Sequence, residues 1–370
     1  MQQMLTPIRL GNVTLKNRII FAPTTMGLSK EAYYKSIEHI AAGGCGMIII
    51  GDVPVLPTRF GPSLYDKKGF AHYQQLAMIA HAHGCKICAQ LHQSDSDLLA
   101  MLPYLPRVLM GALTPNQLRA ILNKKVGPYI THLPEKKVRR ITHAFGKAAE
   151  LAVQAGFDMV QVHGDRMCGS FSSSVYNWRT DRYGGDVYGR SRFALESIAS
   201  IRRHVPSLAI DYKLAVRITS PHYGNAGVRM EDLPAFVPLL EQAGVTSLHV
   251  TLANHSDLSD TIPPANHPYF SQEGCFLFLC DEVRKYTTLP ICGVGGLTDP
   301  DFVEQQISSG RIQCAAMSRQ IIADAQWVNK VAQGRPQDIR RCVRCNQKCL
   351  GGMMQHQGVH CIYDNKEEQP

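Results

Sequence analysis

Short apolar segments alternate with amphipathic helical segments eight times along the chain, and this alternation restricts the fold more than any other feature. Strands that alternate with helices form a parallel sheet, and eight such units match a closed (β/α)8 TIM barrel. An open doubly wound sheet commonly has about five or six strands and a G-x-G-x-x-G turn. This sequence contains no such turn. The strands are predicted at residues 18–23, 47–53, 86–92, 159–164, 214–218, 247–252, 289–296 and 313–318.

A helix is predicted between most consecutive strands and after the last one. The segment at residues 93–134 instead contains several prolines without a regular apolar period, so we interpret it as a long functional loop. The predicted domains are a barrel at residues 1–335 and a cysteine-bearing extension at residues 336–370. The helices are predicted at residues 29–44, 70–84, 135–156, 189–205, 231–244, 275–287, 299–310 and 323–334.

Composition excludes several classes of protein. A content of 45% hydrophobic and 19% charged residues is typical of a globular chain with a large core. No apolar run approaches the roughly 18–20 residues of a membrane span, and the start MQQMLTPIRLGN does not resemble a signal peptide. We therefore expect a cytoplasmic protein with reduced cysteines. The net charge of +9 is dispersed without a basic arm, which argues against nucleic acid. It suits an electron-carrier partner or an anionic ligand, although ordinary solubility explains it as well.

Four cysteines near the end of the chain have the spacing C-x2-C-x3-C-x11-C. Soft thiolates select zinc, Cu(I) or an iron–sulfur cluster. A structural zinc site usually has two pairs of closely spaced ligands separated by a longer stretch of sequence, and this run lacks that arrangement. A disulfide pairing fits poorly without a secretory signal. We interpret the run as an iron–sulfur site, which implies redox chemistry, and leave structural zinc and unmetallated thiols as alternatives. The four residues are Cys342, Cys345, Cys349 and Cys361.

In a barrel of this kind the site lies at the carboxyl ends of the strands. The loops after the seventh and eighth strands commonly bind phosphate. The glycines Gly293, Gly295 and Gly296 follow the predicted seventh strand, and Arg319 follows the eighth. Backbone N–H groups and a guanidinium fork suit a phosphate, so the sequence predicts a phosphorylated cofactor. A tight turn with a surface arginine is the alternative.

Three segments resemble the old yellow enzyme family of flavin mononucleotide (FMN) oxidoreductases, and together they cover nearly the whole chain. They are LTPIRLGNVTLKNRIIFAPTTMGL, AGFDMVQVHG with FSSSVYNWRTDRYGGDVYGRSRF, and ICGVGGLTDP with AAMSRQIIADAQWVNKVAQGRPQDIRRCVRCNQKCL. The cysteine spacing resembles the iron–sulfur branch, which includes 2,4-dienoyl-CoA reductases, 2-enoate reductases and trimethylamine dehydrogenase. That resemblance implies a [4Fe-4S] cluster beside the flavin.

The resemblance also implies how the chain holds FMN. Pro23, Thr24 and Thr25 would line the flavin ring, with Thr25 near its N5 atom. Arg217 would supply a cation at the N1–C2 edge, where it would stabilise the anionic reduced flavin. A structural ion pair is the alternative role for Arg217. The other implied contacts are the backbone of Gly51, Gln90 at the pyrimidine edge, Arg217 over N1–C2, and Ser318 with Arg319 at the phosphate.

The chain also departs from the family pattern. Relatives usually read H-x-x-H/N-G-Y near the fourth strand, and the tyrosine protonates the substrate carbon. This chain has His163-Gly-Asp-Arg166 and no tyrosine there, and Gly296 stands where many relatives have a phosphate-binding arginine. We predict that His163, Arg166 and His255 hold the substrate carbonyl or carboxylate. His255 resembles a histidine of dienoyl-CoA reductases. The alternatives are a flavin-side structural role for His163, a surface ion pair for Arg166 and a surface histidine for His255.

The expected function is FMN- and [4Fe-4S]-dependent reduction of an activated C=C bond in a small-molecule enoate, enone or enoyl-CoA ester. Larger relatives continue into an FAD- and NAD(P)-binding half, whereas this sequence stops nine residues after Cys361. We therefore expect either a separate electron donor, ferredoxin-like or FAD/NAD(P)-binding, or that this sequence is a fragment of a longer enzyme. Two alternatives stay open, an amine or C–H dehydrogenase and a non-catalytic electron-relay subunit. The first favours an aromatic cage for a cation, to which the altered loop contributes only Tyr176 and Trp178. The sequence leaves open the substrate, the proton donor and whether the chain forms a homo-oligomer.

Overall fold

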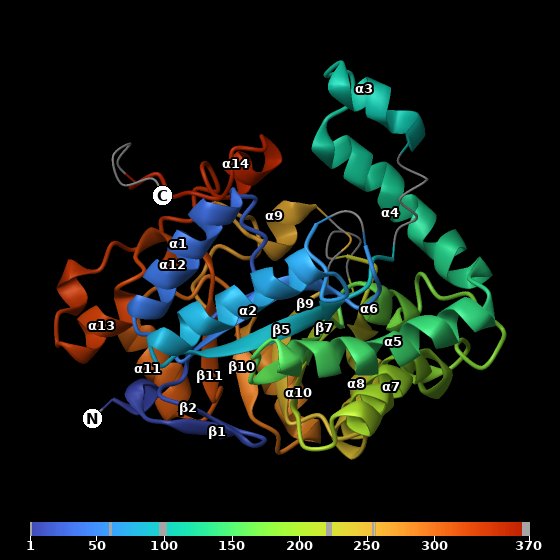
Figure 1. Ribbon diagram of the computed structural model, residues 1–370, viewed down its shortest axis with the longest axis horizontal. Coiled ribbons are helices and arrows are strands. Elements are labelled where there is room, and N and C mark those ends of the chain that lie inside the picture. The colour runs from blue at the N-terminus through green and yellow to red at the C-terminus, as the bar shows by residue number, and fades with distance from the viewer. Residues whose placement is uncertain are drawn as a thin grey trace.

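A closed barrel of parallel strands forms the centre of the computed structural model, which describes residues 2–58, 61–95, 102–219, 224–253, 255 and 257–364 (Figure 1). The barrel closes because the last strand pairs with the first and β6 pairs with β7. The predicted (β/α)8 fold is therefore confirmed. In the described part its eight strands are β3 (Ile19–Phe21), β4 (Met47–Pro54), β5 (Lys86–His92), β6 (Met159–Val162), β7 (Ala209–Arg217), β9 (Ser247–Leu252), β10 (Ile291–Gly293) and β11 (Cys314–Met317).

The fifth barrel strand differs from its prediction. It begins at Ala209 instead of near Leu214. The charged residues Asp211 and Lys213 interrupt the apolar pattern in sequence, but both lie on the side of the strand that faces the barrel interior. A two-residue strand, β8 (Val228–Arg229), extends the sheet beside β7.

The segment predicted to be an irregular loop is largely helical, so this prediction was wrong. It contains α3 (Leu105–Leu109) and the eighteen-residue α4 (Pro115–His132), which project beyond the barrel in Figure 1. Thr114 and Gln117 form a capping box at the start of α4, and a proline occupies its first turn. Residues 96–101 of the same segment lie outside the described residues.

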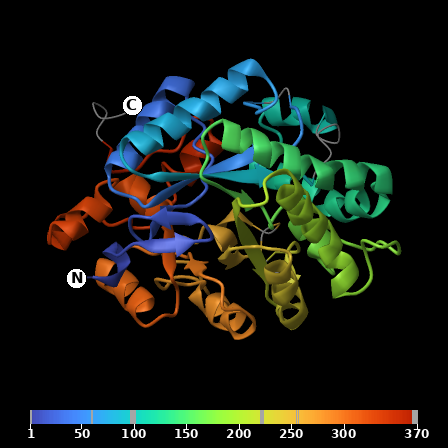
Figure 2. The same ribbon diagram turned by 60° about the horizontal axis from the view of Figure 1, so that its bottom comes forward.

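Helices surround the barrel, as Figure 2 shows. Ser29, Asp66 and Asp186 accept hydrogen bonds from backbone N–H groups and so define where three long helices begin. Within the described ranges every helix is too short or too polar to serve as a membrane span. The helices are α1 (Lys30–Ala42), α2 (Lys67–Ala82), α5 (Glu135–Gln154), α6 (Met167–Ser172), α7 (Val187–His204), α8 (Leu233–Gln242), α9 (Leu258–Thr261), α10 (Leu277–Val283), α11 (Pro300–Ser308), α12 (Arg319–Ala323), α13 (Trp327–Ala332) and α14 (Leu350–Met354).

Two hydrophobic layers stabilise the barrel, because successive strand residues point to opposite faces. Ile48 and Ile50 belong to the large cluster between strands and helices. Ile49 belongs to a smaller interior cluster, together with residues of the hairpin β1 (Ile8–Leu10) and β2 (Val13–Leu15). The hairpin therefore packs against the barrel interior at the end opposite the carboxyl ends of the strands.

A chain of polar side chains crosses four neighbouring strands inside the barrel. Gln90 Nε2 donates to Gln161 Oε1 at 2.6 Å, and Gln161 Nε2 donates to Asp211 Oδ2 at 2.6 Å. Ser247 Oγ donates to Asp211 Oδ1 at 2.6 Å. These residues are successive register partners, so strand pairing places them in one row. The network fixes the orientation of the Gln90 amide, because each partner is itself hydrogen-bonded.

The Asp211 carboxyl makes stability depend on pH. Burial raises its pKa to about 6, although hydrogen bonds from Ser247 and Gln161 oppose the rise. The folded state therefore binds this proton more tightly than the unfolded state, where the pKa is about 3.9. The contribution of Asp211 to the free energy of unfolding is fully present below about pH 4 and is lost as the pH rises to about 6.

We predict that Asp211→Asn removes this decrease. As the pH rises from 4 to 6, the free energy of unfolding of the variant should increase by on the order of 3 kcal/mol relative to that of the wild-type protein. Melting temperatures of both proteins across this range test the prediction, with the exposed Asp301→Asn as control. An unchanged pH dependence in Asp211→Asn would contradict it.

Candidate active site

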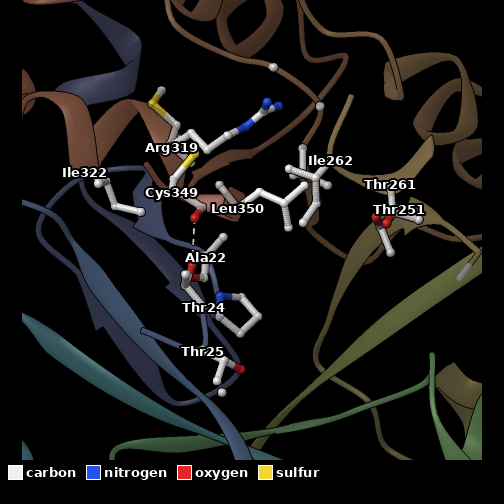
Figure 3. A pocket seen from close by; sticks show the side chains of 18 of the residues that line it. Ala22, Thr24, Thr25, Thr251, Thr261, Ile262, Arg319, Ile322, Cys349 and Leu350 are labelled. Carbon is white, nitrogen blue, oxygen red and sulfur yellow. Dashed lines mark hydrogen bonds between the residues drawn. The ribbon is translucent and has the colours of Figure 1, made fainter. Parts of the chain in front are cut away.

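A cavity of about 310 Å³ opens at the carboxyl ends of the barrel strands. Its size is typical of a site for a cofactor or small substrate. Arg319 and Cys349 lie near one another at one end, above Thr24 and Thr25, while Thr251 and Thr261 lie on the opposite wall (Figure 3). Most predicted site residues meet here. Those that line the cavity are Pro23, Thr24, Thr25, Gly51, Gln90, His163, Arg166, Gly295, Gly296, Ser318 and Arg319.

His255 does not line the cavity. It is 3% exposed, and its Nε2 lies 2.6 Å from Asp95 Oδ2. Its Nδ1 lies 3.0 Å from Asn123 Oδ1, and the ring packs edge-on against Tyr176. These contacts connect the loop after β9 to α4 and to the segment after β5. Its proposed substrate contact stays a prediction without support from the geometry.

Two predicted cofactor residues also lie outside the lining. A Cβ atom on Gly293 would come within 2.6 Å of Leu277 Cδ2, so this glycine permits close packing of β10 on α10. Arg217 lies on the same face of β7 as Lys213, which does line the cavity. Its buried Nε has no hydrogen-bond partner among the described residues. Buried polar groups are nearly always paired, and an unpaired guanidinium N–H is a fitting donor for a bound ligand.

The wall at Thr24 is joined to the wall at Ser318 by a hydrogen bond of 2.7 Å between their hydroxyls. Arg319 Nη1 donates to Pro263 O at 2.9 Å and to Asn346 Oδ1 at 2.7 Å. These contacts hold the guanidinium at the same end of the cavity as the glycines of the β10–α11 turn. The predicted phosphate residues are thus brought together.

Arg344 is a site residue that the sequence analysis missed. It lines the cavity, and a Cβ atom on Gly296 would lie 2.7 Å from its Nη1. The guanidinium of Arg344 therefore lies beside Gly296, the position at which many relatives have an arginine. It is held by the backbone carbonyls of Phe270, Ser271 and Gln272. Local sequence gave no signal for it, because the contact depends on how the cysteine-bearing segment folds back.

Lys213 and His249 were also missed, because both lie within strands. They are register partners on β7 and β9 and both line the cavity. Burial lowers the pKa of each, that of His249 to about 3. His249 is therefore neutral at physiological pH.

The cavity carries more positive than negative charge. This excess favours an anionic ligand, and low-polarity surroundings strengthen such contacts. The charged lining residues are Arg166, Lys213, Arg319 and Arg344 against Asp52 and Asp165.

The four cysteines of the terminal run line one small pocket. Cys342 and Cys349 also line the large cavity, so the two sites share a wall. No three of the four sulfurs lie within 4.8 Å of one another. A tetrahedral zinc site with Zn–S bonds of about 2.3 Å needs sulfurs about 3.8 Å apart. The wider arrangement suits a polynuclear cluster better than zinc.

The aromatic cage expected for an amine dehydrogenase is not formed by the predicted residues. Trp178 is 56% exposed, and Tyr176 is buried against His255. Among the described residues that line the cavity, Phe276 is the aromatic one. The predicted cation cage therefore has no support in the geometry.

Comparisons with known proteins agree with this architecture. The sequence model of the NADH:flavin oxidoreductase / NADH oxidase family matches residues 3–338. A bilirubin reductase of Clostridium symbiosum (strain WAL-14163) is 60% identical, over 98% of this chain and 97% of the relative. A bilirubin reductase of Mediterraneibacter gnavus (strain CC55_001C) is 31% identical, over 97% of this chain and 56% of the relative. The structure of histamine dehydrogenase from Rhizobium sp. 4-9 superposes with a TM-score of 0.79 at 23% identity, covering 97% of this chain and 52% of that one.

The chain thus spans nearly all of one bilirubin reductase and slightly more than half of the other two proteins. The likeness to histamine dehydrogenase shows the barrel fold. The similarity to the bilirubin reductases is in sequence and extends over almost the whole chain.

We predict that Arg344→Ala weakens FMN binding about 10- to 100-fold, because a charge-assisted hydrogen bond contributes about 1.5–3 kcal/mol. Reconstitution of flavin-depleted protein, followed by fluorescence, measures the dissociation constant. Arg341→Ala is the matched control, since Arg341 is in the same segment but pairs with Asp299 at 2.6 Å. Equal affinity of both variants would exclude Arg344 from the phosphate site.

Proposed function

Because the chain belongs to the NADH:flavin oxidoreductase / NADH oxidase family, we propose that it binds FMN and a [4Fe-4S] cluster and reduces a conjugated C=C bond. The observation that carries the proposal is the shared wall, where Cys342 and Cys349 line both the cysteine pocket and the cavity. Bilirubin is the proposed substrate, since a bilirubin reductase is 60% identical over nearly the whole chain. Bilirubin is a linear tetrapyrrole with two conjugated halves and two carboxylates, and the carboxylates suit a cavity with excess positive charge.

The chain's own residues fit FMN. Thr24 and Thr25 would lie against the ring, and the Gln90 amide, oriented by Gln161, would meet the pyrimidine edge. The unpaired Nε of Arg217 supports its proposed place beside the N1–C2 edge. Arg319 and Arg344 would hold the phosphate as cations at one end of the cavity. When bound, FMN accepts and donates hydride and exchanges single electrons with a cluster.

We assign the substrate to the part of the cavity lined by Lys213 of β7 and by the loop after β6. We propose that Arg166 and Lys213 bind the substrate's carboxylates, because a guanidinium and an ammonium both pair with this group. His163 lies beside them and would orient a substrate carbonyl. These contacts hold the reacting bond in one orientation and exclude water from it.

The cluster is proposed as the entry point for electrons from a separate donor protein. Cys345 and Lys348 line the cysteine pocket but not the cavity. Val343, in the same pocket, is 49% exposed, so a donor has access to this segment. Cys342 Sγ accepts a hydrogen bond from the backbone N–H of Arg344 at 3.4 Å. Such bonds to cluster sulfurs tune the reduction potential.

Anaerobic mixing of the reduced protein with bilirubin tests the proposed reaction. We expect rapid reoxidation of the flavin together with loss of the bilirubin absorbance. In Arg166→Ala the apparent KM for bilirubin should rise about 10-fold or more, because a charge-assisted hydrogen bond to the carboxylate is lost. Arg203→Ala is the control, because Arg203 is exposed and lies outside the cavity lining.

Two outcomes would contradict the proposed reaction. Bleaching of the oxidised flavin by dimethylamine or histamine, without reoxidation by bilirubin, would indicate a dehydrogenase. No response to bilirubin or amines would indicate a non-catalytic flavoprotein.

We predict that Cys345→Ser lowers the iron content from about four atoms per chain. Turnover of bilirubin with reduced methyl viologen, a one-electron donor, should fall more than about 10-fold, since electrons would no longer enter through the cluster. Lys348→Ala, in the same loop, should keep its iron and its turnover. Full iron content in Cys345→Ser, or zinc in its place in the wild-type protein, would contradict the cluster.

A further inference from the structure

Three metal-ligating side chains converge at the ends of neighbouring strands β4, β5 and β6. Asp52 lies on β4, His92 ends β5, and His163 follows β6 directly. Their ligand atoms lie within 4.8 Å of one another. Asp52 and His163 line the cavity. We propose that these three residues form a binding site for a divalent transition-metal cation such as Zn²⁺.

The distances between the ligand atoms support the proposal. The two Nδ1 atoms of His92 and His163 are 3.1 Å apart. Asp52 Oδ1 lies 3.4 Å from the first and 3.5 Å from the second. Metal–ligand bonds of about 2.0–2.1 Å at tetrahedral angles place ligand atoms about 3.3–3.4 Å apart. The triangle therefore matches one face of a tetrahedral site.

Hydrogen bonds to the carboxylate explain the two distances to Asp52 less well. A charge-assisted N–H···O bond to a carboxylate is usually about 2.7–2.9 Å long. Both imidazoles stand farther than this from the same Asp52 oxygen. The two Nδ1 atoms, 3.1 Å apart, are within hydrogen-bonding distance of each other. The three atoms instead surround a point that one cation would occupy.

The backbone of β4 is distorted in the way that presents Asp52 to this point. The pairing of β4 with β5 is irregular between Ile50 and Val53. Asp52 has a φ of 54°, in the left-handed region that side chains rarely adopt. Such strain is common at functional sites. Thr25 Oγ1 donates to Asp52 Oδ2 at 3.0 Å, which leaves Oδ1 directed at the histidines. Partners of this kind orient metal ligands.

The donor set defines the class of cation and its ligand. Two imidazoles and one carboxylate suit zinc and other borderline cations, and three protein ligands leave coordination positions open. The Asp52 side chain is 46% exposed, so the open positions face the cavity. They would accept a carbonyl or carboxylate oxygen of a substrate and polarise it.

Zinc binding to the flavin- and iron-loaded protein tests the site without reference to catalysis. Isothermal titration with Zn²⁺ under anaerobic conditions should show one ion per chain, and elemental analysis should recover it after gel filtration. Asp52→Asn and His92→Ala should weaken this binding at least 10-fold. Asn tolerates the left-handed backbone at residue 52, so this variant should fold. The control is His39→Ala, because His39 is exposed on α1.

The possible results separate clearly. Tight binding in the wild-type protein and in His39→Ala, lost in both ligand variants, supports the site. Absence of tight binding would overturn it, as would equal binding in Asp52→Asn, which would place the ion on the cysteines. Neither of these outcomes would contradict bilirubin reduction, which the anaerobic mixing experiment tests separately.

Discussion

Pairing of the first barrel strand with the last is the constraint on which the site depends. The register Phe21 to Met317 closes the barrel and brings together segments that are almost three hundred residues apart in sequence. Because of this register, Thr24 and Ser318 meet in a hydrogen bond of 2.7 Å at the rim. Parallel strands all end at one rim, so the polar residues that follow them must converge there. The cavity is therefore a consequence of strand closure, and its chemistry comes from what each strand end carries.

The terminal segment completes the site that the barrel begins. Arg344 lies beside Gly296 at the cavity, while the cysteines on either side of it turn toward the second pocket. Arg344 and Asn346 both have left-handed backbones, which lets the short loop reverse direction within a few residues. Asn346 in turn holds Arg319. The same loop thus supports one end of the cavity and carries cysteines, so the proposed flavin binding and the proposed electron entry would depend on one segment.

The sequence was sufficient to predict the barrel, because eight apolar segments with intervening helices leave few alternatives. It also predicted that Gln90, His163 and Arg319 lie together at the strand ends of a barrel, and all three line the cavity there. The helix α4 was missed although Thr114 to Gln117 carry a local capping signal. Arg344 could not be found, because its role depends on a long-range fold of the terminal segment. Lys213 was missed for another reason. A charged residue within a strand is predicted to be exposed unless the barrel interior is known to be polar at that position.

Iron anomalous diffraction from a crystal of the anaerobically purified protein tests the central claim most directly, namely that a cluster and a flavin lie on two sides of one wall. The account predicts a group of iron peaks within the pocket of Cys342, Cys345, Cys349 and Cys361, and flavin density in the adjoining cavity. A single zinc at the cysteines, or a cavity without flavin beside an intact cluster, would contradict it.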